Sequence, residues 1–128
     1  MTDRHLVTIQ VTGRPATFAT AHEKPWKDAV RSAVAASGVQ PRDARFAVRL
    51  EFRLVSARNA NEVWDLDNLI KPTLDAMEGV FGARAWRGTP QPADDRVDRI
   101  EATKRLPRVG EVPGVTIDVW VIEPDRRA

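Results

Sequence analysis

The sequence predicts a single α+β domain in which helices pack on a mixed sheet, with the elements in the order β-α-β-α-β-β. Segments whose apolar side chains alternate, as they do in strands, are separated by two segments whose apolar side chains recur at helical spacing. The chain has 128 residues, of which 42% are hydrophobic, so it can build one core of ordinary size. We therefore expect one domain covering residues 1–128, with strands and helices sharing a single core.

The first strand and the first helix are expected in residues 5–11 and 23–37. Apolar residues take alternate positions of the strand segment, which ends before Gly13. The helical segment ends at Gly38, and glycine commonly follows the last turn of a helix. The apolar face of this helix is formed by Trp26, Ala29, Val30, Ala33 and Val34.

Residues 44–57 form the longest predicted strand, and its two sides differ in chemistry. One side is basic and carries Arg45, Arg49 and Arg53. Because successive side chains of a strand point to opposite faces, we expect this side to lie in solvent while the other packs in the core. The core side consists of Phe46, Val48, Leu50, Phe52 and Leu54.

A second helix is expected over residues 68–81, directly after Asp67, with Gly82 as its end. Its buried face should consist of Ile70, Leu74, Met77 and Phe81. Residues 84–95 are expected to form a loop, because they contain a glycine and two prolines. Two more strands follow, over residues 97–104 and 115–122.

Composition excludes several classes of protein. The chain has no cysteine, so it has neither a disulfide framework nor a thiolate metal site, and a metal would need carboxylate ligands. It has no glycine-rich phosphate loop, no EF-hand spacing and no His-Glu-x-x-His sequence. No apolar run approaches the length of a membrane span, and the first residues lack the apolar core of a signal peptide. We therefore expect a cytoplasmic protein with no membrane partner.

The charges are distributed unevenly along the chain. Residues 1–50 contain eight Lys and Arg against four Asp and Glu, whereas residues 51–100 contain seven against nine. The acids are thus concentrated in one stretch of a chain whose computed pI is about 9.5. Divalent metal would neutralise that stretch and leave a basic surface suited to a polyanion, although an ordinary solvated surface has similar charge.

Asp65 and Asp67 are the strongest candidates for a functional site. Asp67 could act as a helix N-cap, but a helix has one cap position and Asp65 cannot share it. Two carboxylates at this spacing repel each other unless a cation or a proton lies between them. Metal binding is therefore the favoured interpretation, with capping of the helix as the alternative.

A lysine and a second acidic pair complete the candidate site. Lys71 follows Asp67 at i+4, where it could form an ordinary helical ion pair with Asp75 or stabilise a phosphate in a transition state. Asp94 and Asp95 come from a distant part of the chain. Together with Asp65 and Asp67 they provide the oxygen ligands that Mg²⁺ prefers, and such ions promote hydrolysis of phosphodiesters.

These residues give the chain a resemblance to the RusA-type Holliday junction resolvases. The family pattern is Asp-x-Asp-Asn-x-x-Lys-x-x-x-Asp-Ala, followed by Asp-Asp and by a strand that ends in Lys. The resemblance covers about residues 64–122, and residues before this stretch agree with the family in their order of strand, helix and strand. The matching positions are Asp65, Asp67, Asn68, Lys71, Asp75, Ala76, Asp94, Asp95 and Lys104.

The resemblance implies a function and a set of roles. Members of the family are small homodimeric α+β proteins, many of them encoded in prophages, that use Mg²⁺ or a similar ion such as Mn²⁺ to cut four-way DNA junctions. By resemblance, Asp65 and Asp67 are metal ligands and Lys71 is the catalytic lysine. Two features of the family pattern give different answers for the last acidic ligand. The usual spacing between this ligand and the next strand selects Asp94, whereas the position within the Asp-Asp pair selects Asp95.

The same resemblance implies that the chain is a metal-dependent endodeoxyribonuclease in DNA recombination and repair, with branched DNA as its partner. Two alternatives remain open, a non-catalytic DNA-binding phage or regulatory protein on the same fold, and a metal-dependent nuclease for other branched nucleic acids. The candidate DNA-binding residues are basic positions on or near the predicted strands, namely Arg45, Arg49, Arg53, Arg58 and Lys104.

Overall fold

The structure, a computed structural model, describes residues 3–16, 21–55, 65–77, 83–86, 89–92 and 96–123, and for 83–86 and 89–92 it describes the backbone alone. Two helices and a four-stranded mixed sheet form an α+β domain, which confirms the predicted fold class. Neither helix among these residues is long and apolar enough to cross a membrane. The main elements are β1 (Asp3–Thr12), α1 (Glu23–Ala36), β2 (Arg45–Arg53), α2 (Leu66–Asp75), β5 (Val97–Arg105) and β6 (Gly114–Ile122).

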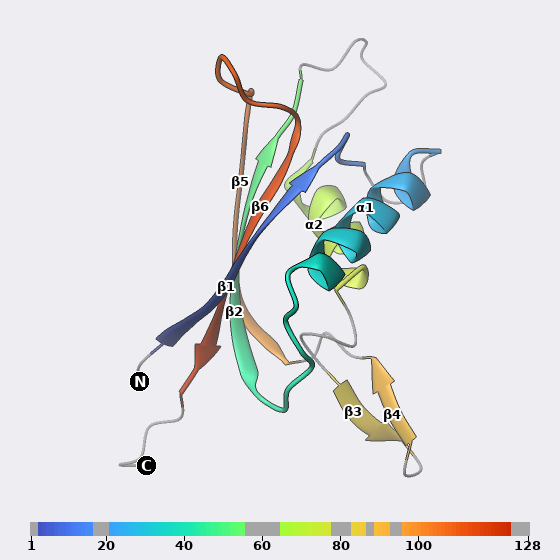
Figure 1. Cartoon of the computed structure of the whole chain (residues 1–128), viewed down its shortest axis with the longest axis vertical. Helices are drawn as coiled ribbons and strands as arrows, with labels where there is room; N and C mark the ends of the chain where they lie inside the picture. The colour runs from blue at the N-terminus through green and yellow to red at the C-terminus, as the bar shows by residue number, and fades with distance from the viewer. Residues whose placement is uncertain are drawn as a thin grey trace.

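The strands of the main sheet lie in the order β1-β6-β2-β5. The last strand, β6, is antiparallel to β1 and to β2, whereas β2 is parallel to β5. Both helices lie on the same side of this sheet (Figure 1). Of the described elements, none covers the other side, which we call the open face. The molecule therefore has two layers, and polar side chains of the sheet can reach solvent on the open face.

A short hairpin corrects the expectation of a loop over residues 84–95. Strands β3 (Ala83–Trp86) and β4 (Thr89–Pro92) pair antiparallel in a separate two-stranded sheet, which lies apart from the main sheet (Figure 1). The two prolines at positions 90 and 92 led to the expectation of a loop, because proline has no N–H to donate. They are two residues apart, however, so they take equivalent places in the β3–β4 ladder. Both strands of a two-stranded sheet are edge strands, and edge strands tolerate proline where a central strand does not.

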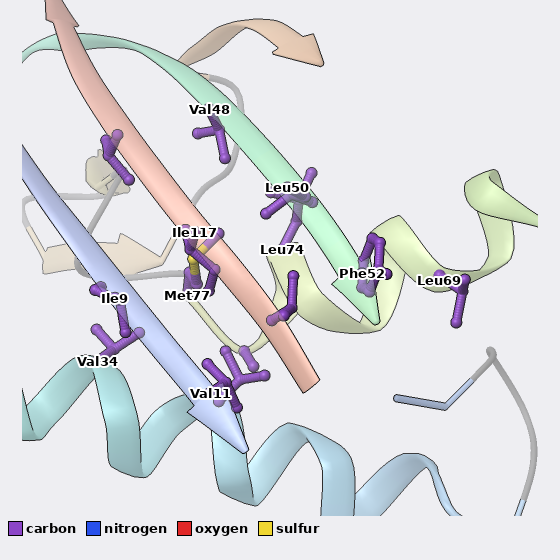
Figure 2. Close-up of a cluster of buried hydrophobic side chains, with 14 of the residues drawn as sticks. Ile9, Val11, Val34, Val48, Leu50, Phe52, Leu69, Leu74, Met77 and Ile117 are labelled. Carbon is purple, nitrogen blue, oxygen red and sulfur yellow. The ribbon is translucent and has the colours of Figure 1, made fainter. Parts of the chain in front are cut away.

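The core lies between the sheet and the two helices (Figure 2). The apolar side of β2 is buried along its whole length, as its alternation predicts. Side chains of β1 and β6 lie beside it, and α1 and α2 cover them from one side. The residues of this core with less than 2% exposure include Trp26, Val30, Phe46, Leu50, Phe52, Leu69, Met77, Val115, Ile117 and Val119.

The predicted end of the first helix is confirmed. The helix α1 ends at Ala36, and Gly38 follows with a φ of +76°. This is the left-handed region, which glycine adopts without a steric penalty. The chain can therefore turn sharply after α1 and enter β2.

Candidate active site

The helix α2 carries the candidate acids, and it begins two residues before the predicted start. Asp65 has extended dihedral angles (φ −71°, ψ 136°) and takes the N-cap position. Its carbonyl oxygen accepts the first helical hydrogen bond, from the Leu69 N–H at 3.1 Å. Asp67 is the second residue of the helix and lies in its first turn. The alternative in which Asp67 is the N-cap is therefore wrong.

The buried face of α2 also differs from the expected one. Leu74 and Met77 are buried as predicted, whereas Ile70 is only partly buried. Phe81 lies outside the described residues. The helical hydrogen bonds begin at Asp65, and the helix turns Leu69, Pro72 and Thr73 into the core instead. The predicted buried face of α2 was incomplete because the prediction considered only large apolar side chains.

A buried hydrogen bond fixes the rotation of α2 against α1. The indole Nε1 of Trp26 donates to Oγ1 of Thr73 at 3.0 Å, and this hydroxyl donates to the Leu69 carbonyl oxygen at 3.0 Å. Thr73 is fully buried, so the hydroxyl satisfies the indole N–H where water cannot reach it. With Thr73 held inward, the opposite side of α2 faces solvent. Sequence reasoning missed this residue, since a threonine in an amphipathic helix gives no signal of its own.

The outward side of α2 presents the two candidate metal ligands of the first turn. Asp65 and Asp67 are both exposed. Neither forms a side-chain hydrogen bond or an ion pair with any residue that the structure describes, and the Asp65 carboxylate makes no capping bond. The helix dipole favours negative charge here, but by only a few tenths to about 1 kcal/mol. Exposed carboxylates without a cationic partner among the described residues are suited to binding a cation from solution.

Lys71 lies one turn after Asp67 on the same side of the helix. Its Nζ is 3.3 Å from Oδ2 of Asp75, and the Lys71 side chain is 57% exposed while that of Asp75 is 21% exposed. Asp67, Lys71 and Asp75 follow one another at i, i+4 and i+8, so they form one row along α2. The Asp75 pair holds the lysine on the surface that carries Asp65 and Asp67.

The remaining predicted ligands are not placed. Asp94 and Asp95 lie outside the described residues, as does Arg58. Within the described parts of the chain, no three Asp, Glu or His side chains converge on a point that could hold a metal ion. Asp65 and Asp67 supply carboxylate oxygens of the kind that Mg²⁺ takes, so the donors fit the ion. Convergence with Asp94 or Asp95 stays a prediction.

Arg53 does not lie on an exposed basic surface, although the alternation of side chains along its strand predicted that it would. The residue is only 7% exposed. Its Nε donates to the Val112 carbonyl oxygen at 3.1 Å, and its Nη1 donates to Oγ1 of Thr116 at 2.8 Å. It lies against Gly114, where a Cβ atom would come within 3.1 Å of the guanidinium and 1.9 Å of the Val11 carbonyl oxygen. The expectation of an exposed Arg53 is wrong, because the turn into β6 covers it.

The other predicted DNA-binding residues that the structure describes are exposed, but they do not share one surface. Arg45 and Arg49 have side-chain exposures of 49% and 51%, and they pair with Asp98 and Asp118. Lys104 is exposed at the edge strand β5, directly opposite Phe52 in the parallel ladder. Opposite residues of a ladder point to the same face, so Lys104 points to the helix-covered side. Arg49 points to the open face.

Comparison with known families adds an independent finding. Residues 2–120 match the family model described as Endodeoxyribonuclease RusA. No curated protein matches the sequence as a relative. The family match extends well beyond the acidic motif and includes the first strand and the first helix, which the motif alone could not assign. The chain therefore belongs to the RusA family of endodeoxyribonucleases.

Proposed function

We propose that this chain is a Mg²⁺-dependent endonuclease that resolves four-way DNA junctions. The observation that supports this proposal is the pair Asp65 and Asp67, unpaired and exposed beside Lys71 at the start of α2, in a chain of an endodeoxyribonuclease family. A protein that only binds DNA gains nothing from unneutralised carboxylates near phosphates, because the charges repel. This argues against the non-catalytic alternative.

In this proposal each residue has a distinct task. Asp65, Asp67 and either Asp94 or Asp95 hold one or two Mg²⁺ ions, with Mn²⁺ as a substitute. An ion held by these carboxylates would supply a water molecule of lowered pKa and positive charge near the leaving oxygen of a phosphodiester. Lys71 places its ammonium where negative charge increases on the phosphate, a role worth about a hundredfold in rate for a single donor. Asp75 keeps Lys71 oriented toward that position.

We further propose that the active form is a homodimer. A four-way junction presents two equivalent strands, and symmetric cutting needs two active sites related by a two-fold axis. One chain carries one set of these acids. Sedimentation should show a dimer at micromolar concentration, alone or with junction DNA. A monomer under both conditions would favour a nuclease for flaps or another branched nucleic acid.

The deciding experiment compares substrates and metals. Labelled four-way junction, linear duplex and flap DNA are incubated with the protein in Mg²⁺, Mn²⁺ or EDTA. We expect paired, symmetric nicks in the junction with either metal, little cutting of the duplex, and no cutting in EDTA. Preferential cutting of the flap would support the other nuclease, and binding without cutting in any metal would support the DNA-binding alternative.

A further inference from the structure

A pocket lined by arginines lies at the end of the sheet where β2 and β5 begin and β6 ends. Figure 1 shows this end of the sheet as a backbone ribbon. Its volume is about 650 Å³. None of the candidate metal ligands lines it, and three of its four arginines are absent from the predicted DNA-binding set. The charged residues of its lining are Arg4, Arg42, Arg45, Arg96, Asp43 and Glu123.

Carboxylates hold three of these arginines in place. Nε of Arg4 is 3.1 Å from Oε1 of Glu123. Arg96 pairs with Asp43, and Arg45 pairs with Asp98 at the side of the pocket. These partners restrict the long side chains before any ligand arrives, so a ligand would not bear the whole entropic cost of ordering them.

The remaining arginine is Arg42, which precedes β2. It is exposed and forms no ion pair with a residue in the described parts of the chain. The lining together with Asp98 thus carries four positive and three negative charges, a net charge of +1. An anion is the ligand class that this charge favours.

The shape of the charged groups favours a phosphate among anions. A guanidinium presents a planar fork of N–H donors that matches the oxygen atoms of a phosphate. The apolar walls formed by Ala44, Val121 and Ile122 keep water away from one side and strengthen the attraction. Asp43 competes for Arg96, but its side chain is 86% exposed, and an ion pair with so exposed a carboxylate is weak. A phosphate could displace this carboxylate.

We propose that this arginine pocket binds a non-scissile phosphate of the DNA backbone. The inference rests on the proposed function, since it takes DNA as the substrate. Arg96 directly follows Asp95, one of the remaining candidate metal ligands, in the sequence. The task of the pocket is to position the strand, because phosphate contacts fix register and orientation.

The first test measures DNA binding in EDTA, where no cutting occurs. Arg42→Ala should weaken binding of a labelled duplex or junction by about tenfold. It should also reduce the slope of log affinity against log salt concentration by about 0.9, the value for one lost phosphate contact. The matched control is Arg31→Ala, which removes an exposed arginine that pairs with Asp28 on α1. This control should leave both quantities unchanged.

The second test uses the competing carboxylate. Asp43→Asn should tighten DNA binding by a few fold, because the Asp43 carboxylate no longer competes with the phosphate for Arg96. A purely structural ion pair predicts a lower melting temperature and no gain in affinity. Unchanged affinity and slope in both Arg42→Ala and Arg4→Ala, with unchanged melting temperatures, would overturn the proposal.

Two further outcomes separate this proposal from its alternatives. If inorganic phosphate raises the melting temperature of the wild type but not of Arg42→Ala, while duplex affinity is the same for both, the pocket takes free phosphate and the DNA assignment is wrong. If the wild type binds no DNA in EDTA, the proposal is also overturned. Because cutting is not measured, a chain that fails to cleave junctions can still show the Arg42 effect, so the two proposals fail separately.

Discussion

The carboxylates at the start of α2 and the carboxylate on the open face of the sheet differ in whether they have a cationic partner. At the start of α2, Asp65 and Asp67 are exposed and have no cationic partner among the described residues. On the open face, Asp118 accepts hydrogen bonds from Thr8 and from Nη2 of Arg49, the latter at 3.0 Å. Neighbouring strands thus neutralise Asp118, whereas no described residue neutralises Asp65 or Asp67.

Strand register explains why the open face can neutralise its own charges. Asp118 on β6 stands opposite Thr8 on β1 and opposite Arg49 on β2. Burial alone would raise the pKa of the Asp118 carboxyl, but the hydrogen bonds from Thr8 and Arg49 outweigh it and hold that pKa below its usual range. The Arg49 guanidinium also lies 5.3 Å from the ring centroid of Trp120. Neighbouring strands thus supply partners at fixed positions.

The first turn of a helix offers no such neighbours. Side chains at i and i+2 diverge around the axis, and the next position on the row of Asp67 is Lys71, which pairs with Asp75. A protein that needed only stability could neutralise Asp67 through that lysine. Instead the lysine is held one turn away, and the unneutralised pair is what a metal site requires.

The largest expected effect is that of removing one unpaired carboxylate. Asp67→Asn should lower junction cleavage by more than a hundredfold in Mg²⁺, since under the proposed function it removes a metal ligand. DNA affinity in EDTA should be equal or higher, because the change reduces repulsion of phosphate. The measurements are gel cleavage and fluorescence anisotropy.

The matched control is Asp118→Asn, which removes a paired carboxylate of the sheet. It should leave cleavage near the wild-type rate and reduce stability by about 1 kcal/mol, as expected for one weakened charged hydrogen bond. Near-normal cutting by Asp67→Asn would show that Asp67 serves only the helix.

Lys71→Ala should lower cleavage by about a hundredfold, with at most a modest loss of DNA affinity. The physical reason is that the ammonium acts on charge that develops in the transition state. Lys24→Ala is the control, because Lys24 forms the same i,i+4 ion pair with Asp28 on α1, with Nζ 2.8 Å from the carboxylate. If both variants slowed cleavage equally, Lys71 would be an ordinary surface ion pair.

The link that orients α2 can be tested by Thr73→Val. The substitution keeps the shape of the side chain but removes the acceptor for the Trp26 indole, leaving a buried N–H unsatisfied. The expected loss is about 1–3 kcal/mol in the free energy of unfolding, measured with urea. Thr73→Ser keeps the hydroxyl and should retain the hydrogen bond. Equal losses in the two variants would assign the effect to packing and not to the hydrogen bond.

The smallest effect concerns acid stability. Hydrogen bonds from Arg105 and from the Arg108 N–H lower the pKa of Glu111 from 4.5 to about 2. A lowered folded-state pKa gives stability that is present above pH 4.5 and is lost as the pH falls toward about 2. Glu111→Gln should therefore flatten the fall of the melting temperature between these values. An unchanged pH profile would contradict this assignment.

The apolar pattern of the sequence determined much of the sheet. Along β2 and the residue after it, the alternation from Phe46 to Leu54 placed five side chains in the core, and all five are buried. The α+β class and the end of α1 near Gly38 were predictable for the same reason, because local periodicity and backbone preference set them. The acidic motif of α2 was also readable, since its spacing is a property of the chain.

Tertiary structure alone decided three features, each of which joins parts far apart in sequence. Thr73 is buried because the Trp26 indole reaches it from another helix, 47 positions away. Arg53 is buried although its strand position predicts exposure, because the turn before β6 supplies a carbonyl and β6 itself supplies the Thr116 hydroxyl that satisfy it. Arg4 and Arg96 share a pocket only because β1, β2, β5 and β6 meet at one end of the sheet. Periodicity reports whether a position faces inward, but the partner that makes a polar group stable there comes from elsewhere in the fold.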